Sequence, residues 1–240
     1  MVKRNQAAAA RADDAATLGL RERGKLEKRR RIKAAARQAF TESGYDAATT
    51  RDIAALAEIG IGTLFTYAKD KRELLLMIIN DDLDALAGTA VQSVDPHAPL
   101  VDQLAAFFES RYRYWAGQPA LGRPAVRETL DFLGGVAPQG PEAIRFYARR
   151  PRMLAALTDI VRSWRQRERV AADVPVDLAA SLFITIYLTE VRRWLMEPAP
   201  NADEGLRRFR ELASLAIRGV APASGPSAAP EGGSNKLSGV

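Results

Sequence analysis

The chain has 240 residues, of which 47% are hydrophobic, and its formal net charge at pH 7 is +6. This length and apolar content suffice for one or two domains with a buried core. The absence of cysteine excludes disulfides, thiolate metal sites and cysteine nucleophiles. The longest uncharged stretches, such as residues 178–189, have 12 residues and are too short to cross a bilayer. Asp13 and Asp14 interrupt the N-terminal alanine run before the apolar core of a signal peptide could form. We therefore expect a soluble, cytoplasmic protein.

The positive charge is concentrated near the N-terminus. Residues 1–37 contain 12 Lys and Arg against 4 Asp and Glu, a local balance of +8, so residues 38–240 together have a balance of −2. The densest part consists of Lys25, Lys28, Arg29, Arg30, Arg31 and Lys33. Such a cluster releases counterions when it binds phosphates, and a basic arm can enter a minor groove. The alternative is a solvated tail without a partner.

Residues 1–24 are Ala-rich and aperiodic, which predicts a disordered basic tail. Apolar spacing then predicts a helix over residues 26–43, which ends at Gly44. The expected inner face of this helix consists of Ile32, Ala35, Ala36, Ala39 and Phe40.

Two short helices separated by a tight turn are predicted next. The first begins with Thr49 and Thr50, either of which can cap a helix start, and places Ile53 on a buried face. Residues 58–60 form the turn, and residues 61–67 form the second helix. Two helices joined in this way are the helix-turn-helix unit, whose second helix enters the major groove of DNA.

The remainder of the chain is also predicted to be helical. Asp70 is the expected cap of a helix over residues 71–91. Further helical segments are expected over residues 101–117, 120–133, 142–172, 177–197 and 202–220. Pro151 is expected to break or kink the 142–172 segment. Its expected inner residues are Ile144, Tyr147, Leu154, Leu157, Ile160, Val161 and Trp164. Residues 221–240 are rich in Pro, Gly, Ser and Ala, which predicts a flexible tail.

The stretch from Arg30 to Leu76, about a fifth of the chain, resembles the DNA-binding segment of the tetracycline repressor (TetR) family of bacterial regulators. Its most specific part is G-T-L-F-T-Y at residues 62–67, and R-R-I-K-A-A-A-R-Q-A-F-T-E-S-G-Y upstream is similar to the family's first helix. The resemblance implies an all-α protein. A three-helix helix-turn-helix DNA-binding domain would occupy residues 25–70, and a helical ligand-binding and dimerisation domain would occupy residues 71–220.

The resemblance and the residue chemistry together predict the DNA-binding residues. They are Lys28, Arg29, Arg30, Arg31, Thr49, Thr50, Arg51, Gly62, Thr63, Thr66, Tyr67, Lys69 and Lys71. Arg51 has the geometry for a bidentate contact to guanine, and the threonines can bind base edges or phosphates. Tyr67, Lys69 and Lys71 match positions that contact the sugar-phosphate backbone in the family.

Three positions in this segment depart from the family's usual residues, and Gly62 has two alternative roles. Gly62 either lets the second helix approach the groove closely or serves as a turn glycine. Glu58 stands where the family usually has a turn glycine, so we expect a turn that is strained or built differently. Phe65 replaces the commoner tyrosine, and Ala68 stands where a core phenylalanine is usual.

Aromatic residues of the C-terminal helices are candidates for lining an apolar cavity, the usual setting for a small-molecule site. The candidate ligand-binding residues are Phe108, Tyr112, Trp115, Tyr147, Trp164 and Tyr187, with Phe107 beside them. The alternative is ordinary core packing. Four arginines of this region have two alternative roles: they contribute polar contacts to a ligand, or they cover the protein surface. They are Arg111, Arg113, Arg145 and Arg149.

Residues 177–197 are apolar almost all round, so this helix needs cover on every side. In TetR-like proteins the last two helices form a four-helix bundle with the same pair of a second subunit. We therefore expect a homodimer through residues 177–197 and 202–220. A twofold dimer suits a palindromic operator, because two recognition helices about 34 Å apart can engage successive major grooves.

Enzyme signatures are weak. The only histidine, His97, lies between prolines in an expected loop, and the sequence contains no GxSxG, Walker or HExxH motif. No metal and no cofactor are expected.

The expected function is a homodimeric repressor that a small-molecule effector releases from double-stranded DNA. Such a protein would be cytoplasmic and would join the bacterial nucleoid when bound. The alternatives are a DNA-binding regulator without an effector, and a helical enzyme or carrier.

Overall fold

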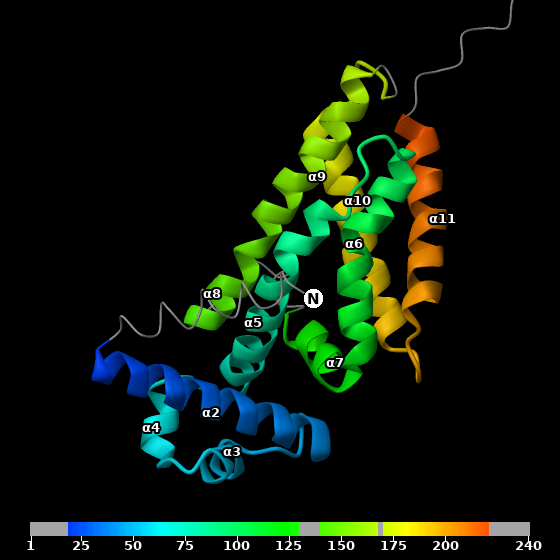
Figure 1. Ribbon diagram of the computed structural model, residues 1–240. Helices are drawn as coiled ribbons and strands as arrows, with labels where there is room; N and C mark the ends of the chain where they lie inside the picture. The colour runs from blue at the N-terminus through cyan, green and yellow to red at the C-terminus, as the bar shows by residue number, and fades with distance from the viewer. Residues whose placement is uncertain (1–18, 130–139, 168–169, 221–240) are drawn as a thin grey trace, which may run out of the picture.

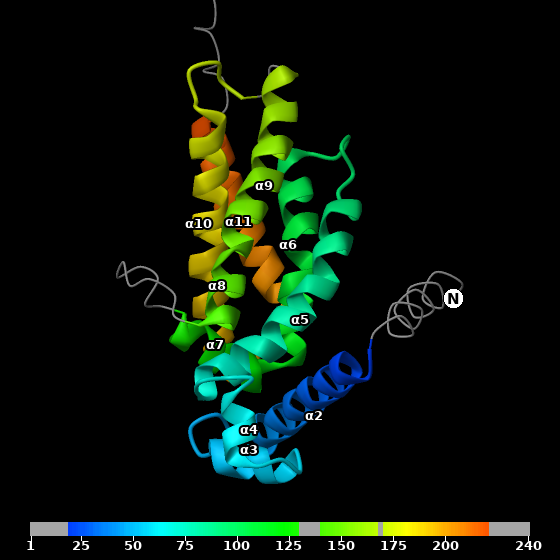
Figure 2. The same ribbon diagram turned by 90° about the vertical axis from the view of Figure 1, so that its left-hand side faces the viewer.

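The structure, a computed structural model, describes residues 19–129, 140–167 and 170–220, and every regular element in these ranges is an α-helix (Figure 1). The predicted all-α class is therefore confirmed. Three helices form the N-terminal part, namely α2 (Leu20–Glu42), α3 (Thr50–Leu56) and α4 (Ile61–Phe65). Figures 1 and 2 both place them at one end of the molecule, with the other helices extending away from them.

Seven helices follow in the described residues. They are α5 (Lys71–Gln92), α6 (Leu100–Gly117), α7 (Pro119–Glu128), α8 (Pro141–Tyr147), α9 (Arg149–Gln166), α10 (Val176–Leu195) and α11 (Ala202–Val220). Helix α5 connects the two parts, because it packs against α2 as well as against α6 and α8. Helix α10 packs between α9 and α11, and α11 also covers α6. None of the helices in the described part combines the length and hydropathy needed to cross a membrane.

The N-terminal helices surround a small apolar core. Phe40, Ile53 and Leu64, one from each helix, are fully buried, as the spacing predicts. The Thr49 hydroxyl caps α3, since it accepts a hydrogen bond from the backbone N–H of Asp52 at 3.2 Å. Asp70 caps α5 in the same way, accepting from the N–H of Glu73 at 2.8 Å. Both predicted caps are confirmed.

Helix α2 begins at Leu20, six residues before the expected start at Leu26. The extension consists mainly of Arg, Glu, Lys and Leu, which are strong helix formers. An ion pair of 2.8 Å between Glu27 and Arg30, one turn apart, also stabilises this end of α2. The predicted disordered tail over residues 1–24 is therefore wrong at residues 20–24, which belong to α2. Its residues 1–18 and the predicted tail at 221–240 lie outside the described residues.

The predicted helix over residues 142–172 is two helices, and the break differs from the expected position. Helix α8 ends at Tyr147 and α9 begins at Arg149, so the chain breaks ahead of Pro151. Proline has no N–H to donate to the carbonyl of residue 147, but it fits the first turn of a new helix without losing a bond. Ile144, an expected inner residue, is 56% exposed, which corrects that prediction. The expected residues 130–133 of the 120–133 segment lie outside the described ranges.

An aromatic cluster forms the core of the C-terminal part. Phe108 of α6 stacks on Tyr187 of α10 with ring centroids 4.1 Å apart, and Phe209 of α11 meets Phe108 edge-on at 5.1 Å. Tyr112 packs edge-on against Trp194 at 5.1 Å. Phe108 and Tyr112 therefore join three helices together.

Candidate functional site

The turn between α3 and α4 is built on Glu58, whose φ is +50°. A non-glycine residue in this left-handed region carries strain of about 1–2 kcal/mol, so the strain expected from the missing glycine is present. Arg31 of α2 supports the turn. Its guanidinium donates to the carbonyl oxygens of Ala57 at 2.6 Å and Glu58 at 3.2 Å, and it also pairs with the Glu58 carboxylate at 2.9 Å. Arg31 is thus engaged within the protein.

Helices α3 and α4 expose a mixed polar and apolar face. Four residues of this face are exposed, namely Arg51 on α3, Gly62 on α4, Thr66 at the C-cap of α4 and Lys69 beyond it. Thr50 and Thr63 are half-buried. Phe65 is 48% exposed and points outward as well. Helices α3 and α4 lie at one end of the molecule, below α5 in the view of Figure 2.

Gly62 lies inside α4 and not in the turn, which excludes its alternative role as a turn glycine. A Cβ atom added at this position would meet no atom within 4 Å. The surface of α4 is therefore open there, and the protein itself does not require a glycine.

Two of the predicted backbone-contact residues also hold the domain together. Lys71 donates from Nζ to the carbonyl oxygens of Asp46 at 3.0 Å and Ala48 at 3.2 Å, and lies 4.7 Å above the Tyr45 ring. The Tyr67 hydroxyl donates to the carbonyl oxygen of Lys25 at 3.4 Å. Both side chains fix the loops and helices that present the exposed face.

Among the basic residues of α2, Arg29 faces the C-terminal part. It pairs with Asp81 of α5 at 2.8 Å and with Glu142 of α8 at 2.9 Å. Arg29 is therefore engaged in the link between the two parts of the molecule, and its contact with DNA stays a prediction. Lys28 and Arg30 are exposed.

Asp81 is the centre of this link. It accepts hydrogen bonds from Arg29 and Lys33 of α2 at 2.8 Å, and Arg145 of α8 donates to it at 2.8 Å. Burial raises the pKa of Asp81, but the three cationic donors outweigh burial and hold the pKa well below its ordinary value. Arg145 also pairs with Asp84, one turn further along α5, at 2.5 Å. Charged side chains thus connect α2, α5 and α8.

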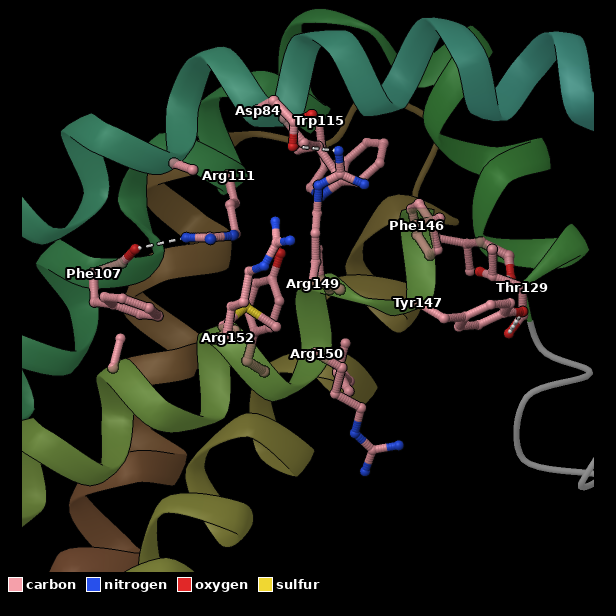
Figure 3. Close-up of a pocket in the computed structure, with 18 of the residues that line it drawn as sticks. Asp84, Phe107, Arg111, Trp115, Thr129, Phe146, Tyr147, Arg149, Arg150 and Arg152 are labelled. Atoms are coloured by element: carbon pink, nitrogen blue, oxygen red, sulfur yellow. Dashed lines mark hydrogen bonds and ion pairs between the residues drawn. The ribbon is translucent and has the colours of Figure 1, made fainter. Parts of the chain in front are cut away.

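A cavity of about 300 Å³ lies among α5 to α10 (Figure 3). Its lining residues are Leu83, Asp84, Ala87, Phe107, Arg111, Trp115, Val126, Thr129, Phe146, Tyr147, Arg149, Arg150, Arg152, Met153, Ala156, Tyr187, Leu188, Val191 and Arg192. Five of them are arginines and one, Asp84, is a carboxylate. The cavity therefore combines an apolar wall with an excess of positive charge.

Half of the predicted ligand-binding aromatic residues line this cavity. The lining includes Trp115, Tyr147 and Tyr187, but it does not include Phe108, Tyr112 or Trp164. On α6 the lining face is Phe107, Arg111 and Trp115, spaced four residues apart. Phe108 and Tyr112, one residue further on, face α10 and α11 instead. Trp164 lies two turns beyond Ala156, where the lining part of α9 ends.

Most of the α9 residues that line the cavity were not predicted from the sequence, namely Arg150, Arg152, Met153 and Ala156. Arg149, Arg152, Met153 and Ala156 follow helical spacing, i, i+3, i+4 and i+7, which is the signal that would have found them, whereas Arg150 lies outside this pattern. Of the four arginines considered earlier, Arg111 and Arg149 line the cavity. Arg145 belongs to the link at Asp81, and Arg113 is exposed.

The arginines of the cavity differ in their partners. Arg149 donates to the Asp84 carboxylate at 2.5 Å and to the carbonyl oxygen of Asn80 at 2.7 Å. Arg111 donates to the Phe107 carbonyl of its own helix at 3.2 Å, and its guanidinium lies 5.1 Å from the Phe107 ring centroid. Burial lowers the pKa of Arg111, Arg149 and Arg192, although arginine stays protonated at neutral pH.

No group of three or more His, Cys, Asp or Glu side chains in the described ranges is arranged to hold a metal ion. His97 lies in the exposed loop before α6, and its backbone N–H donates to the Asp95 carboxylate at 2.9 Å.

Comparison with known proteins agrees with this geometry. Residues 32–78 match the family described as bacterial regulatory proteins, tetR family. The HTH-type transcriptional repressor Rv1474c of Mycobacterium tuberculosis is 30% identical to the chain over 151 residues, which cover 63% of this chain and 73% of that protein. The chain belongs to the TetR family.

Solved TetR-family structures share the fold. Thermus thermophilus FadR, a TetR-family repressor in complex with lauroyl-CoA, aligns with a TM-score of 0.61 and 21% identity, covering 83% of this chain and 98% of that one. Bacillus subtilis FadR in complex with stearoyl-CoA aligns with a TM-score of 0.58 and 17% identity, covering 79% and 98%. The protein is therefore a TetR-family transcriptional regulator with an N-terminal helix-turn-helix, and its family is one of DNA-binding regulators and not of enzymes.

Proposed function

We propose that this TetR-family regulator is a homodimeric repressor that a small molecule releases from a palindromic operator. Residues 25–70 would bind DNA, and residues 71–220 would bind the effector and the second subunit. The observation that supports this most directly is the cavity, because α5 forms part of its wall and is ion-paired to α2 through Asp81. Such a protein acts in the cytoplasm, on the nucleoid.

The exposed face of α3 and α4 is the proposed DNA-binding surface. Arg51 is exposed at the first turn of α3 and has the donor geometry for guanine. Thr63 and Thr66 flank the open surface at Gly62, where α4 would approach the groove. Lys28, Arg30 and Lys69 would contact phosphates, and the helix-end amides at Thr49 and Thr50 would add to these contacts.

Apolar side chains on α10 and α11 support the dimer. Leu178 and Leu182 on α10 are 63% and 42% exposed, and Leu215 on α11 is 57% exposed. Their helices are neighbours, so a second copy of the same pair would cover them in a twofold four-helix bundle.

Release is proposed to be a shift between two arrangements of α5. Arg149 lines the cavity and binds Asp84, Arg145 binds both Asp84 and Asp81, and Asp81 binds α2. A molecule in the cavity can therefore change how α5 holds α2, and with it the spacing of the two DNA-binding domains. It lowers operator affinity only by the factor by which it prefers the released arrangement.

The test begins with selection of bound fragments from random and genomic DNA by the full chain, followed by a salt titration. Recovery of a palindrome with half-sites about one helical turn or a small multiple apart supports a dimeric operator-binding protein. Absence of sequence enrichment, with affinity that disappears as salt rises, contradicts specific regulation.

Effectors are then sought by release of that operator. Because two FadR proteins of this fold are complexes with lauroyl-CoA and stearoyl-CoA, acyl-CoAs belong in the first set of amphipathic compounds. A compound that fills the cavity and lowers operator affinity supports the proposal. Unchanged operator affinity across the whole set favours a TetR-family regulator without an effector.

A further inference from the structure

The cavity contains more positive charge than its own carboxylate can balance. Besides Arg150, its lining residues include four arginines, Arg111, Arg149, Arg152 and Arg192, but a single acidic side chain, Asp84. Asp84 is already shared between Arg149 and Arg145. A buried cation is costly unless an anion or several hydrogen bonds accompany it. The cavity as it stands is therefore short of negative charge.

Arg111 is the clearest case. No Asp or Glu in the described ranges pairs with it, and its one hydrogen bond runs to a carbonyl of its own helix. Burial lowers its pKa, the Tyr187 phenol partly offsets this by raising the pKa, and the neighbouring positive charge of Arg149 lowers it. A guanidinium has five N–H donors, and Arg111 uses one of them within the described part of the chain, so the group can still donate to an anion.

Arg149, in contrast to Arg111, is already paired with a carboxylate of the protein, Asp84. Its Nη2 donates to Asp84 Oδ1, while its Nε is buried and has no acceptor in the described part of the chain. In Figure 3 the Arg149 side chain extends toward Asp84, that of Arg111 turns to the Phe107 carbonyl, and that of Arg150 points away from both. The Asp84 carboxylate therefore acts as an internal counter-ion for one of the two half-buried cations.

We infer that the effector is an amphiphile with an anionic head, and that the head binds Arg111 and competes with the Asp84 carboxylate for Arg149. The inference rests on the proposed function, since it names the ligand class and the trigger of the same cavity. The head is a carboxylate or a phosphate, either of which accepts the paired N–H donors of a guanidinium.

The remaining wall fits the apolar part of such a molecule. Phe107, Met153, Ala156 and Leu188 supply carbon surface from three helices. The volume of about 300 Å³ is at the small end for ligand sites, so a short chain with one charged head fits better than a large polar compound.

Competition for Arg149 also supplies a trigger. Asp84 lies on α5, and it holds Arg149 at the start of α9 and Arg145 on α8. When an anionic head takes Arg149, the contact between Arg149 and Asp84 is lost, and Arg149 keeps only its bonds to Asn80 on α5. The helix that binds α2 through Asp81 is then held less firmly against α8 and α9.

The test uses the full chain and three octyl compounds with one tail and different heads, namely octanoate, octyl phosphate and 1-octanol. Binding is measured by calorimetry. We expect at least one of the two anions to bind about tenfold more tightly than the alcohol, since a charge-assisted hydrogen bond in a desolvated site has this magnitude. The two anionic arms show whether the head is a carboxylate or a phosphate.

Variants locate the head group. Arg111→Gln should reduce the affinity for the anions about tenfold and leave the alcohol unchanged, whereas the matched change Arg113→Gln on the exposed side of α6 should alter neither. Asp84→Asn removes the competing charge and should raise the affinity for the anions several-fold. Because Arg111 has no acidic partner, Arg111→Gln should melt no lower than the wild-type protein.

Equal affinity for the three compounds, or the same loss in Arg111→Gln and Arg113→Gln, overturns the inference, as does the absence of binding by any of them. Operator release, measured in parallel, separates the two proposals. Release by 1-octanol with no effect of Arg111→Gln keeps the ligand-released repressor and rejects the anionic head. Anion binding at Arg111 without any change in operator affinity keeps the site and rejects ligand release.

Discussion

Gly140 lies directly against the carboxylate of Glu73, and a Cβ atom added at position 140 would stand 2.6 Å from Glu73 Cδ. The same buried carboxylate accepts hydrogen bonds from the backbone N–H groups of Glu142 at 3.1 Å and Ala143 at 2.9 Å, in the first turn of α8. A side chain near the start of α5 thus caps a helix about seventy residues later in the chain. The helix that follows the helix-turn-helix is fixed to the cavity wall by this contact.

Gly140→Ala should therefore destabilise the protein by about 1–3 kcal/mol, because it combines a φ of +97° with a clash against a buried carboxylate. Urea unfolding of the two proteins measures the difference. Gly117→Ala is the matched control, since Gly117 has no atom within 4 Å of an added Cβ and no positive φ. Equal unfolding midpoints for the two variants would contradict the role of Gly140.

Asp81→Asn should lower stability at pH 7 by about 1–3 kcal/mol, a range that allows for partial exposure of the pair. The pKa of Asp81 is lowered in the folded state, so the unfolded chain takes up this proton first as pH falls. The stabilisation is therefore complete above the unfolded pKa of about 4 and decreases below it. Urea unfolding at pH 7 and pH 3 should show a smaller gap between wild type and variant at pH 3. A gap that does not narrow would show that Asp81 is not the titrating group.

Gly62→Ala should separate stability from DNA binding. An exposed glycine inside a helix costs about 0.5–1 kcal/mol relative to alanine, so the free protein should become slightly more stable. Operator affinity, measured by fluorescence anisotropy, should fall because the methyl group occupies the surface that approaches the groove. Gly24→Ala in α2 should give similar stability without loss of affinity. Unchanged operator affinity of Gly62→Ala would show that α4 does not approach the DNA groove closely at this position.

Arg51→Ala and Lys71→Ala should affect DNA binding in different ways, the first by changing sequence preference and the second by lowering the affinity for every sequence. Arg51 is exposed, so its removal should leave stability unchanged and relax discrimination at one base position by about 1–3 kcal/mol. Lys71→Ala should weaken binding to all sequences alike, and it should also destabilise the domain, because Lys71 holds the carbonyls of Asp46 and Ala48. Binding to a set of singly altered operators, together with thermal unfolding, distinguishes these outcomes. Identical behaviour of the two variants would mean that the roles are wrongly divided.

Leu182→Glu should convert the proposed dimer to monomer, because it places a charge in an interface that would be desolvated. Sedimentation gives the oligomeric state, and operator affinity should fall with it. Ile144→Glu makes the same change at an exposed position on α8, away from α10 and α11, and should leave the assembly intact. A wild-type monomer at micromolar concentration would remove the basis for the four-helix bundle.

The sequence predicts the helix-turn-helix well because its signals are local. Thr49 and Asp70 cap helices through bonds to residues three positions away, and Ile53 and Leu64 follow helical spacing. Arg29 shows the limit of such signals. It lies in a basic run typical of phosphate contact, yet its partners, Asp81 and Glu142, are 52 and 113 residues away.

The cavity could be predicted only in part for a similar reason. Both faces of α6 are rich in aromatic residues, so spacing alone does not show whether Phe107 or Phe108 faces the cavity. Packing decides it, because Phe108 stacks on Tyr187 in the core. The end of α8, in contrast, was within reach of the sequence, since a helix that precedes proline stops before it loses the N–H that proline lacks.

The way α2 uses its basic run limits how strongly salt can affect DNA binding. Of the four consecutive cations at residues 28–31, Arg29 is bound to Asp81 and Glu142, Arg31 is bound to the α3–α4 turn, and Arg30 pairs with Glu27 at the surface. Cations already neutralised by the protein release no counterions when DNA binds. Each missing phosphate contact reduces the slope of log affinity against log salt by about 0.9. The salt dependence of operator binding should therefore be shallower than the +8 balance of residues 1–37 suggests.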